Sequence, residues 1–401
     1  MKRVSGRWRT NKIKQTYTLQ NSIELIRSGR IYFDTLEKHI NSANHEIHIQ
    51  TYILASDDTG SRIAEALIRA AKRKVQVFLL VDAFGSQNFT VDLIDRITNA
   101  GVHFRKFGEL YSKGIFHLGR RMHHKIAVFD GNVSIVGGIN ISDDYNDTPG
   151  NPAWLDFAVI MQGNVSRRLQ FICRQRWNKW VFSFRSRKRL LINYWPENKI
   201  TGFSPIRIRT NDFIRNKNGI ANSYREVMRC SEKSILIVGG YFLPGGRTRR
   251  LMKSAIKRGV IINVVVSEKS DVRIIDLARK YLYGWLIRNG IHVFEYKPSN
   301  VHGKVIISDE MFTSIGSYDL NNLSTYSNIE LNVDINDENF SKKLTTYINQ
   351  IIQKDCIKLD GENMYKDNTL LSKLLRWFSY RFVKTLFVLS ILLSGKKEKN
   401  F

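Results

Sequence analysis

Cysteine and proline are both scarce in this sequence. Its 401 residues contain three cysteines and six prolines. Cys173, Cys230 and Cys356 are far apart and odd in number, which excludes a disulfide framework and a Cys-x2-Cys metal site and favours a reducing compartment. Because 43% of the residues are hydrophobic and few are proline, a disordered chain is excluded and a globular protein is expected.

Acidic residues are also few compared with basic ones. The chain has 36 Asp and Glu against 63 Lys and Arg, a formal net charge of +27. Such a charge favours a polyanionic partner, either nucleic acid or an anionic lipid surface, and does not by itself choose between them. A generally basic proteome is the alternative explanation. Residues 1–14 are basic and lack an apolar run, so we expect no secretory signal.

One pattern, H-x-K-x4-D, occurs twice, and its histidines are 179 positions apart (302 − 123). The copies are His123, Lys125 and Asp130, and then His302, Lys304 and Asp309. With nine histidines in the chain, roughly 0.04 matches are expected by chance at typical residue frequencies. Each copy is followed by a glycine turn, at 137–138 and at 316–317. The duplication therefore indicates two related halves.

The surrounding elements repeat in the same order. We expect a strand, a helix, a second strand, a second helix and a short strand before each motif. In the first half these cover 46–54, 63–73, 75–82, 91–99 and 102–104; in the second they cover 234–243, 248–258, 260–266, 276–288 and 291–294. Gly101 and Gly290 are expected to end the second helix of each half. This alternation predicts two α/β units with largely parallel sheets.

The paired motifs fit phosphodiester chemistry. On an extended strand, residues two apart project from the same face, so each histidine lies beside its lysine. If the two halves face each other, one neutral imidazole can attack phosphorus while the other, protonated, donates to the leaving oxygen. Two lysines then neutralise the phosphate, and no metal or other cofactor is expected.

Further polar residues accompany the two motifs. The glycine turn at Gly138 allows close backbone approach, and Asn140 and Ser317 can donate hydrogen bonds to phosphate oxygens. Asp130 and Asp309 complete the motifs, and we interpret them as salt-bridged or capping residues.

A carboxylate behind each imidazole would fix its tautomer and stabilise its charged form. Asp156 and Glu330 lie in the strands that follow the two motifs and are candidates for this role, one completing each half. The alternative is that both are ordinary surface carboxylates.

The C-terminal segment has a different composition. Leu370–Leu393 is rich in apolar residues, and its four cations, Lys373, Arg376, Arg381 and Lys384, fall within roughly 140° on a helical wheel. Its longest charge-free run, Thr385–Gly395, has 11 residues, short of the ~20 that cross a bilayer. We predict an amphipathic helix lying in a membrane interface. The alternative is a helix packed in a core or dimer contact.

The motifs resemble those of the phospholipase D superfamily. Segments 120–130 (RRMHHKIAVFD), 136–140 (VGGIN) and 316–324 (GSYDLNNLS) are most similar to bacterial cardiolipin synthases, and the resemblance covers roughly residues 20–355. It implies two fused phospholipase D-type α/β/α sandwich domains related by pseudo-twofold symmetry, with the C-terminal amphipathic helix in addition. The expected divisions are a basic tail (1–20), a first domain (21–190), a linker (191–205), a second domain (206–358) and the helix (366–395).

The resemblance also implies roles for the residues. Asp156 and Glu330 match the acidic partners of the histidines, and the implied reaction is phosphatidyl transfer through a phosphohistidine, without a metal. Relatives suggest His123 as nucleophile and His302 as general acid, although the near-symmetric site leaves that order open. The family's second turn usually reads G-S-x-N, whereas this chain has Asp319, which either turns away, pairs with a cation or is protonated.

The expected activity is that of a cardiolipin synthase, which converts two phosphatidylglycerol molecules to cardiolipin and glycerol. Phosphatidylethanolamine as donor and other small alcohols as acceptor stay open. The expected partner is an anionic phospholipid membrane, contacted at the cytoplasmic face of the bacterial cytoplasmic membrane, with no nucleic acid. A superfamily nuclease or phosphodiesterase is the alternative enzyme, and a basic membrane-surface protein with a degenerate site is the alternative without catalysis.

Overall fold

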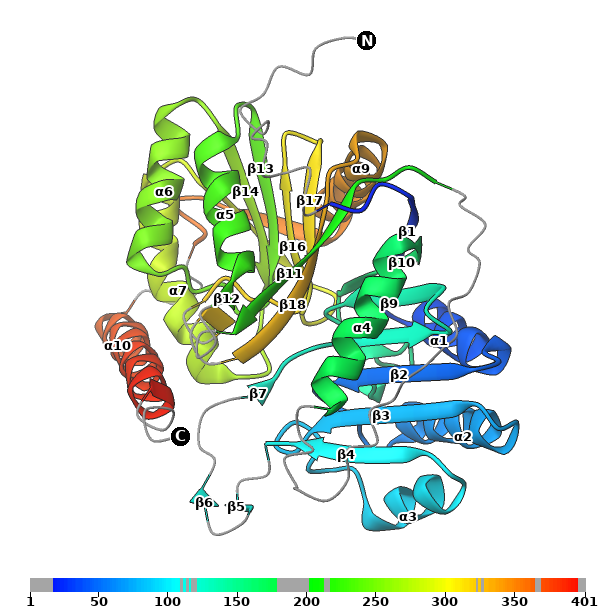
Figure 1. Cartoon of the computed structure of the whole chain (residues 1–401). Helices are drawn as coiled ribbons and strands as arrows, with labels where there is room; N and C mark the ends of the chain where they lie inside the picture. Colours follow the sequence, from blue (N-terminus) through cyan, green and yellow to red (C-terminus); the bar gives the residue numbers. More distant parts are fainter. Residues whose placement is uncertain are drawn as a thin grey trace.

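Two sheets, each with helices on both of its faces, make up the body of the protein (Figure 1). The computed structural model describes residues 17–108, 111–112, 115–116, 121–178, 202–212, 217–321, 324–325, 328–364 and 369–395. Most of the expected basic tail, residues 1–16, and of the expected linker, residues 191–201, lies outside this described part. The chain has the α/β class that its alternating pattern predicts.

The first unit is built on a seven-stranded sheet with the order β1-β10-β9-β8-β2-β3-β4. Its strands are β1 (Asn21–Arg27), β2 (Glu46–Thr51), β3 (Gln76–Asp82), β4 (His103–Phe107), β8 (Ile126–Phe129), β9 (Val133–Gly137) and β10 (Phe157–Gly163). Its helices are α1 (Arg30–Ser42), α2 (Asp58–Lys72), α3 (Val91–Asn99) and α4 (Asn164–Asn178). The small strands β5 (Tyr111–Ser112) and β6 (Ile115–Phe116) pair with each other away from the sheet.

The second unit repeats this plan on a ten-stranded sheet whose main order is β12-β11-β18-β17-β16-β13-β14-β15-β19. Its strands are β11 (Ile206–Asp212), β12 (Lys217–Asn218), β13 (Ser234–Gly239), β14 (Ile261–Ser267), β15 (His292–Tyr296), β16 (Lys304–Ser308), β17 (Phe312–Gly316), β18 (Asn328–Ile335) and β19 (Cys356–Leu359). Its helices are α5 (Gly219–Cys230), α6 (Gly246–Lys257), α7 (Arg273–Arg288) and α9 (Glu338–Asp355). The tenth strand, β7 (Arg121–Met122), comes from the first half of the chain and pairs with β18.

The expectation of largely parallel sheets is wrong. In the first sheet only β2, β3 and β4 run parallel, and every other neighbouring pair is antiparallel. In the second sheet β13, β14 and β15 run parallel, β7 runs parallel to β18, and the other neighbouring pairs are antiparallel. The helical crossovers that parallel pairs need occur only before each motif, whereas the motif strand itself turns back directly into its neighbour.

Three large hydrophobic cores and a small fourth one hold the layers together. One lies between the first sheet and helices α1, α2 and α3, and another lies between the second sheet and helices α5, α6 and α7. The third joins the inner faces of both sheets, with α4 and α9 beside them, through residues such as Val136, Phe157, Val238 and Leu331. Because this shared core includes residues of both units, it fixes the position of one sheet relative to the other.

Polar residues and glycines mark the ends of the helices. Asp57 caps α2 by accepting a hydrogen bond from the Gly60 amide at 2.8 Å, which satisfies one of the free N–H groups of the first turn. Gly101 (φ +98°) and Gly290 (φ +77°) follow α3 and α7 in the left-handed conformation that suits glycine. Both glycines therefore end the helices that they were expected to end.

The C-terminal helix α10 (Leu370–Gly395) lies along α7 at the edge of the second unit (Figure 1). Its buried side includes Arg376, Ser379 and Val383, and Val383 belongs to the outer core of that unit. The predicted separation of cations from apolar residues is therefore only partly correct. Arg376, a cation, faces the protein, and Val383, an apolar residue, packs into its core. None of the helices in the described ranges has the length and apolar character needed to cross a bilayer.

Candidate active site

The first histidine pairs with a carboxylate from the second unit. His123 directly follows β7, and its Nδ1 lies 3.0 Å from Oε2 of Glu330 on β18. The Ser317 carbonyl oxygen lies 3.0 Å from the same nitrogen. With Nδ1–H donated to this oxygen cluster, the lone pair of the imidazole is on Nε2.

The second histidine forms the reciprocal pair. His302 Nδ1 lies 2.7 Å from Oδ2 of Asp156, which immediately precedes β10 of the first unit. Asp156 is fully buried and the His302 side chain is nearly so. Each imidazole is thus backed by a buried carboxylate of the opposite unit, which corrects the expectation that each half completes its own pair.

The backbone explains this crossing. Met122 pairs with Ile329 as parallel strand neighbours, and the His123 amide donates to the Ile329 carbonyl at 2.9 Å. In the other half the His302 amide donates to the Leu155 carbonyl at 2.8 Å. Within the first sheet, β9 separates β10 from the motif strand β8, a distance of about 9.5 Å at normal strand spacing. Asp156 is therefore nearer to the facing unit than to its own motif.

Two buried lysines add positive charge to the same place. Lys125 Nζ donates to the His123 carbonyl at 3.2 Å, and Lys304 Nζ donates to the His302 carbonyl at 2.5 Å. Burial, and then the neighbouring charge of Lys304, lowers the pKa of Lys125 to about 7. Two ammonium groups confined close together bind an anion strongly, because the anion relieves their mutual repulsion.

The two carboxylates titrate in opposite directions. Burial opposes ionisation of Glu330, but the charge and hydrogen bonds of His123 and Ser317 outweigh it, so the pKa of Glu330 is lowered. Burial raises the pKa of Asp156 to about 7, in spite of the charge of Lys304. Burial, and then the charges of Lys304 and Lys125, lowers the pKa of His302. Glu330 is therefore ionised, whereas Asp156 and His302 share a proton near neutral pH.

The polar residues of the two turns support the carboxylates and the imidazoles. The Ser317 hydroxyl donates to Glu330 at 2.5 Å, and the Asn140 amide donates to the Tyr145 hydroxyl at 2.8 Å. The Tyr145 ring packs edge-on against His302, with ring centres 5.0 Å apart. The hydroxyl proton of Ser317 is thus used by Glu330, and direct donation to phosphate by Ser317 and Asn140 stays a prediction. For Asn140 the structure shows a positioning contact.

Gly138 has a steric role. A Cβ atom at this position would lie 2.3 Å from Oδ1 of Asp156, closer than any real contact. Because Gly138 has no side chain, the Asp156 carboxylate can lie against it and contact His302 of the other unit.

Asp319, the residue that departs from the family pattern, pairs with a cation. Its Oδ1 lies 3.4 Å from Lys304 Nζ, and both side chains are buried. Of the three possibilities raised by the sequence, the structure has the ion pair. Lys304 therefore has a negatively charged partner in Asp319. The matching residue of the first half, Asn140, is neutral and gives Lys125 no such partner.

Asp130 and Asp309 lie outside the site. Each follows the last residue of a motif strand, about 17 Å along that strand from its lysine at normal strand rise. Asp130 accepts from the amides of Asn44, His45 and Glu46 at 2.8–2.9 Å, and Asp309 accepts from the amides of residues 232–234 at 2.8–3.0 Å. They cap the start of β2 and of β13. The capping interpretation agrees with the structure, which gives Asp130 and Asp309 no place among the catalytic residues.

This geometry gives a stability prediction. Asp130→Ala or Asp309→Ala removes a carboxylate that accepts three amide hydrogen bonds, and we expect each change to lower the free energy of unfolding by about 2–3 kcal/mol. Urea unfolding measures the loss, and kcat of the folded fraction should stay within about twofold. Asp92→Ala, on the exposed first turn of α3, is the control for removing a carboxylate. A loss of kcat by orders of magnitude with unchanged stability would contradict the capping role.

Two aromatic residues of the site were not singled out from the sequence. Tyr52 packs edge-on against His123 at 4.9 Å between ring centres, and Lys125 Nζ lies 5.1 Å from its ring centre. Tyr241 has the equivalent place in the other half, 6.2 Å from His302, with Lys304 Nζ 5.9 Å from its ring centre. Both tyrosines follow the first strand of their repeat, so an alignment of the two repeats would have identified them as an equivalent pair.

Comparisons with known proteins agree with this architecture. The model of the family described as "Cardiolipin synthase, PLD-like domain" matches residues 36–151 and 224–352. Cardiolipin synthase B of Escherichia coli K12 is 30% identical over 85% of this chain and 82% of its own length. The major cardiolipin synthase ClsA of Bacillus subtilis is 29% identical over 82% of this chain and 68% of its own length.

The solved structures show the same fold at lower sequence identity. Phosphatidylserine synthase of Haemophilus influenzae superposes with a TM-score of 0.70 at 13% identity, covering 96% of this chain and 99% of that one. The family match covers more than half of the chain and falls on both halves of the crossed site. The chain therefore belongs to the cardiolipin synthase family, a family of phosphatidyltransferases within the phospholipase D superfamily.

Proposed function

We propose that this protein joins two phosphatidylglycerol molecules into cardiolipin and glycerol through a phosphohistidine intermediate. The observation that carries the proposal is the crossed site, in which two imidazoles with buried carboxylate partners flank two buried lysines. The similarity to cardiolipin synthases of Escherichia coli and Bacillus subtilis supports the choice of lipid substrate.

In the first half of the reaction His123 is the nucleophile. Ionised Glu330 holds the Nδ1–H and raises the basicity of Nε2, which attacks phosphorus. The N–P bond forms as the bond from phosphorus to the glycerol oxygen breaks, and the lysines neutralise the phosphate oxygens. The opposite titration of Glu330 and Asp156 supports this order, because only Glu330 is held ionised behind its histidine.

His302 handles the protons. Paired with Asp156, it donates a proton to the departing glycerol oxygen, which leaves as the alcohol. In the second half the primary hydroxyl of another phosphatidylglycerol attacks phosphorus, returns its proton to the pair and breaks the N–P bond. All atoms balance, since two phosphatidylglycerol molecules give one cardiolipin and one glycerol.

The substrate lies in a membrane, and we propose that α10 docks the protein on it. Its outward side carries large apolar residues that are 43–75% exposed: Leu370, Leu371, Leu374, Leu375, Trp377, Phe378, Phe382, Leu386 and Leu389. Exposed cations lie beside this side at Lys373, Arg381 and Lys384. A helix of this kind inserts its apolar side among acyl chains while its cations meet anionic headgroups.

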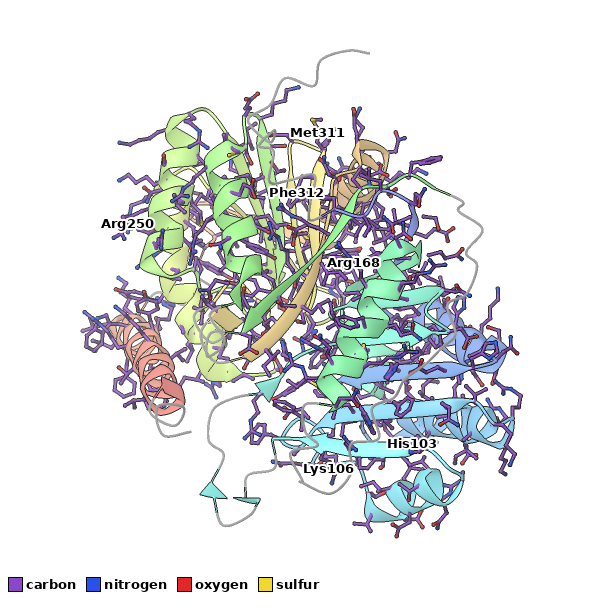
Figure 2. All side chains as sticks on the ribbon, viewed as in Figure 1. His103, Lys106, Arg168, Arg250, Met311 and Phe312 are labelled. Atoms are coloured by element: carbon purple, nitrogen blue, oxygen red, sulfur yellow. The ribbon has the colours of Figure 1, made fainter. Side chains whose placement is uncertain are left out.

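Helix α6 extends this surface. Arg249 of α6 donates to the Tyr380 hydroxyl of α10 at 3.4 Å, so the two helices are neighbours. Arg247, Arg250, Lys253 and Lys257 of α6 are exposed, and Arg250 points outward from the helix in Figure 2. We place this combined surface on the cytoplasmic face of the bacterial cytoplasmic membrane, supported by three free cysteines that are far apart in the chain.

Replacing Trp377 and Phe378 by glutamine tests this docking surface. The two side chains are 44% and 59% exposed in the protein, so folding should be little affected. We expect the affinity for phosphatidylglycerol vesicles to fall about tenfold or more, since each residue loses roughly 1–2 kcal/mol of acyl-chain burial. Vesicle sedimentation measures binding, and Phe171→Gln, at an exposed position on α4, is the control. Unchanged binding would mean that another surface contacts the membrane.

The depressed pKa of Lys125 predicts the pH dependence. The ammonium is present below its pKa of about 7 and is lost as the pH rises through that value. We therefore expect kcat/KM for phosphatidylglycerol to fall as the pH rises above about 7, by up to tenfold per pH unit. Lys304→Gln removes a repelling charge, so the fall should move to higher pH. A flat profile to about pH 9, or a limb that Lys304→Gln leaves in place, would contradict the assignment.

The function itself is tested with purified protein and vesicles of labelled phosphatidylglycerol. We expect cardiolipin and glycerol to appear in equal amounts as phosphatidylglycerol is consumed. Single- and double-stranded nucleic acids serve as competing substrates in parallel reactions. Cleavage of nucleic acid without any transfer product would overturn the lipid assignment in favour of a superfamily nuclease.

A further inference from the structure

Asp319 places a carboxylate beside the phosphate-binding lysines, and the mechanism above does not use it. Its Oδ1 lies 3.4 Å from Lys304 Nζ, and its side chain is only 4% exposed. Within the residues that the structure describes, this oxygen has no hydrogen-bond partner, so its contact with Lys304 is purely ionic. Because a buried carboxylate oxygen without a donor is destabilising, its presence here suggests a role in the site.

Geometry keeps this carboxylate close to any phosphate that Lys304 binds. A phosphate oxygen that accepts a hydrogen bond from an ammonium group lies about 2.8 Å from its nitrogen. The 3.4 Å between Lys304 Nζ and Asp319 Oδ1 then keeps that phosphate oxygen within about 6 Å of the carboxylate. Since the Lys304 side chain is fully buried, water and salt screen the repulsion between the two anions only weakly.

The charge of Asp319 also reaches the other lysine. Burial and the charge of Lys304 lower the pKa of Lys125, and the charges of Glu330, Asp156 and Asp319 oppose this lowering. Glu330 and Asp156 each contact the Nδ1 of an imidazole, whereas Asp319 contacts a lysine. Asp319 therefore adds negative charge next to the lysines themselves, while the other two carboxylates lie behind the histidines.

The matching residue of the first half, Asn140, is neutral. Its Oδ1 accepts from the Ile53 amide at 3.2 Å, and its Nδ2 donates to the Tyr145 hydroxyl at 2.8 Å. The two lysines thus bring two positive charges to the phosphate, and Asp319 cancels one of them. The remaining single charge matches a phosphodiester, which carries one negative charge, whereas a phosphomonoester carries nearly two at neutral pH.

We propose that Asp319 makes the phosphate site selective for singly charged phosphodiesters by repelling doubly charged phosphomonoesters. This inference rests on the proposed function, because it takes the two lysines as the ligands of the substrate phosphate. Repulsion by a fixed carboxylate is proportional to the charge of the ligand, so a phosphomonoester loses about twice as much binding free energy as a phosphodiester.

This selectivity separates the substrate from the by-product of hydrolysis. Phosphatidylglycerol is a phosphodiester, whereas a phosphatidyl group that is transferred to water instead of an alcohol leaves as phosphatidic acid, a phosphomonoester. Two buried lysines without a counter-charge would hold the doubly charged by-product more tightly than the substrate. Asp319 prevents this retention and leaves the site free for the next phosphatidylglycerol.

The first test compares two water-soluble probes in phosphorus NMR titrations near pH 7, where methyl phosphate carries nearly two charges and dimethyl phosphate carries one. We expect the wild type to bind methyl phosphate no more tightly than dimethyl phosphate. Asp319→Asn should bind dimethyl phosphate about tenfold and methyl phosphate about a hundredfold more tightly than the wild type does. Asp92→Asn, which removes an exposed carboxylate on α3, should match the wild type.

Two results of these titrations would overturn the proposal. One is a preference of the wild type for methyl phosphate, which decides the question without any variant. The other is an equal change in affinity for both probes in Asp319→Asn. Asparagine has the same shape as aspartate, so the variant should fold, and thermal unfolding checks that it does.

The second test measures how phosphatidic acid inhibits cardiolipin formation in mixed vesicles with phosphatidylglycerol. We expect the half-inhibiting share of phosphatidic acid to be about tenfold lower for Asp319→Asn than for the wild type. Equal inhibition of the two proteins would count against the role of Asp319. Charge selectivity in the probe titrations without any cardiolipin formation would instead overturn the proposed function and leave the role of Asp319 supported.

Discussion

His123→Ala is expected to lower the rate of cardiolipin formation by at least three orders of magnitude. The variant removes the atom that would carry the phosphatidyl group, and catalysis by a covalent route cannot proceed without it. The loss should appear in kcat as well as in kcat/KM, because the two lysines that hold the phosphate are still present. Initial rates with mixed vesicles measure it.

The matched control for this variant is a histidine far from the chemistry. His103 lies on β4 at the outer edge of the first sheet (Figure 2), where it stacks on Phe78. His103→Ala should keep kcat within about twofold. Thermal unfolding of both variants separates a loss of chemistry from a loss of folded protein. Substantial transfer activity in folded His123→Ala would contradict a covalent route through this residue.

His302→Ala is expected to be equally damaging with phosphatidylglycerol but to recover with a different donor. Glycerol is a poor leaving group, so removing the proton donor should reduce the rate by about 10²–10⁴-fold. A nitrophenyl phosphodiester has a leaving oxygen that needs no proton. With that donor the first step of His302→Ala should fall by less than about tenfold, measured as the burst of nitrophenol.

This comparison also assigns the order of the two histidines. His123→Ala should show no burst with either donor, since no nucleophile is present. A burst retained by His123→Ala and abolished in His302→Ala would reverse the roles. The lowered pKa of Glu330 and the raised pKa of Asp156 favour the order proposed here.

Much of the fold follows from local patterns. Helix α3 has the predicted bounds Val91–Asn99, and strands β3 and β14 agree with the predicted ones within one residue at each end. These elements are strongly periodic or uniformly apolar, and they end at glycine or at polar residues. Such patterns depend only on residues that are close together in the chain, so the sequence alone is sufficient to predict these elements.

The pairing of elements was harder to predict. The motif strands form tight antiparallel hairpins around Asp130 and Asp309, whose positive φ angles of 51° and 52° turn the chain back. No local pattern distinguishes such a strand from one in a parallel sheet, because both are short apolar runs. The expected parallel sheets were wrong for this reason.

The crossed carboxylates depend on contacts between distant parts of the chain. Asp156 and Glu330 were identified as candidates from their position after each motif, but their partners lie 146 and 207 residues away. The alternation of residues along a strand predicts which face of the sheet a side chain is on, but not which unit packs against that face. The same limit applies to Ser317, whose hydroxyl is used by Glu330.

The most direct test of the account is the identity of the residue that carries the phosphatidyl group. Wild type and His302→Ala are mixed with a short-chain ether-linked phosphatidylglycerol, quenched rapidly in alkaline denaturant, and digested for peptide mass spectrometry. The account predicts a phosphodiester adduct on His123 that is stable in base, is lost in acid and disappears when acceptor lipid is added. An adduct on His302, or turnover without any adduct on either histidine, would contradict it.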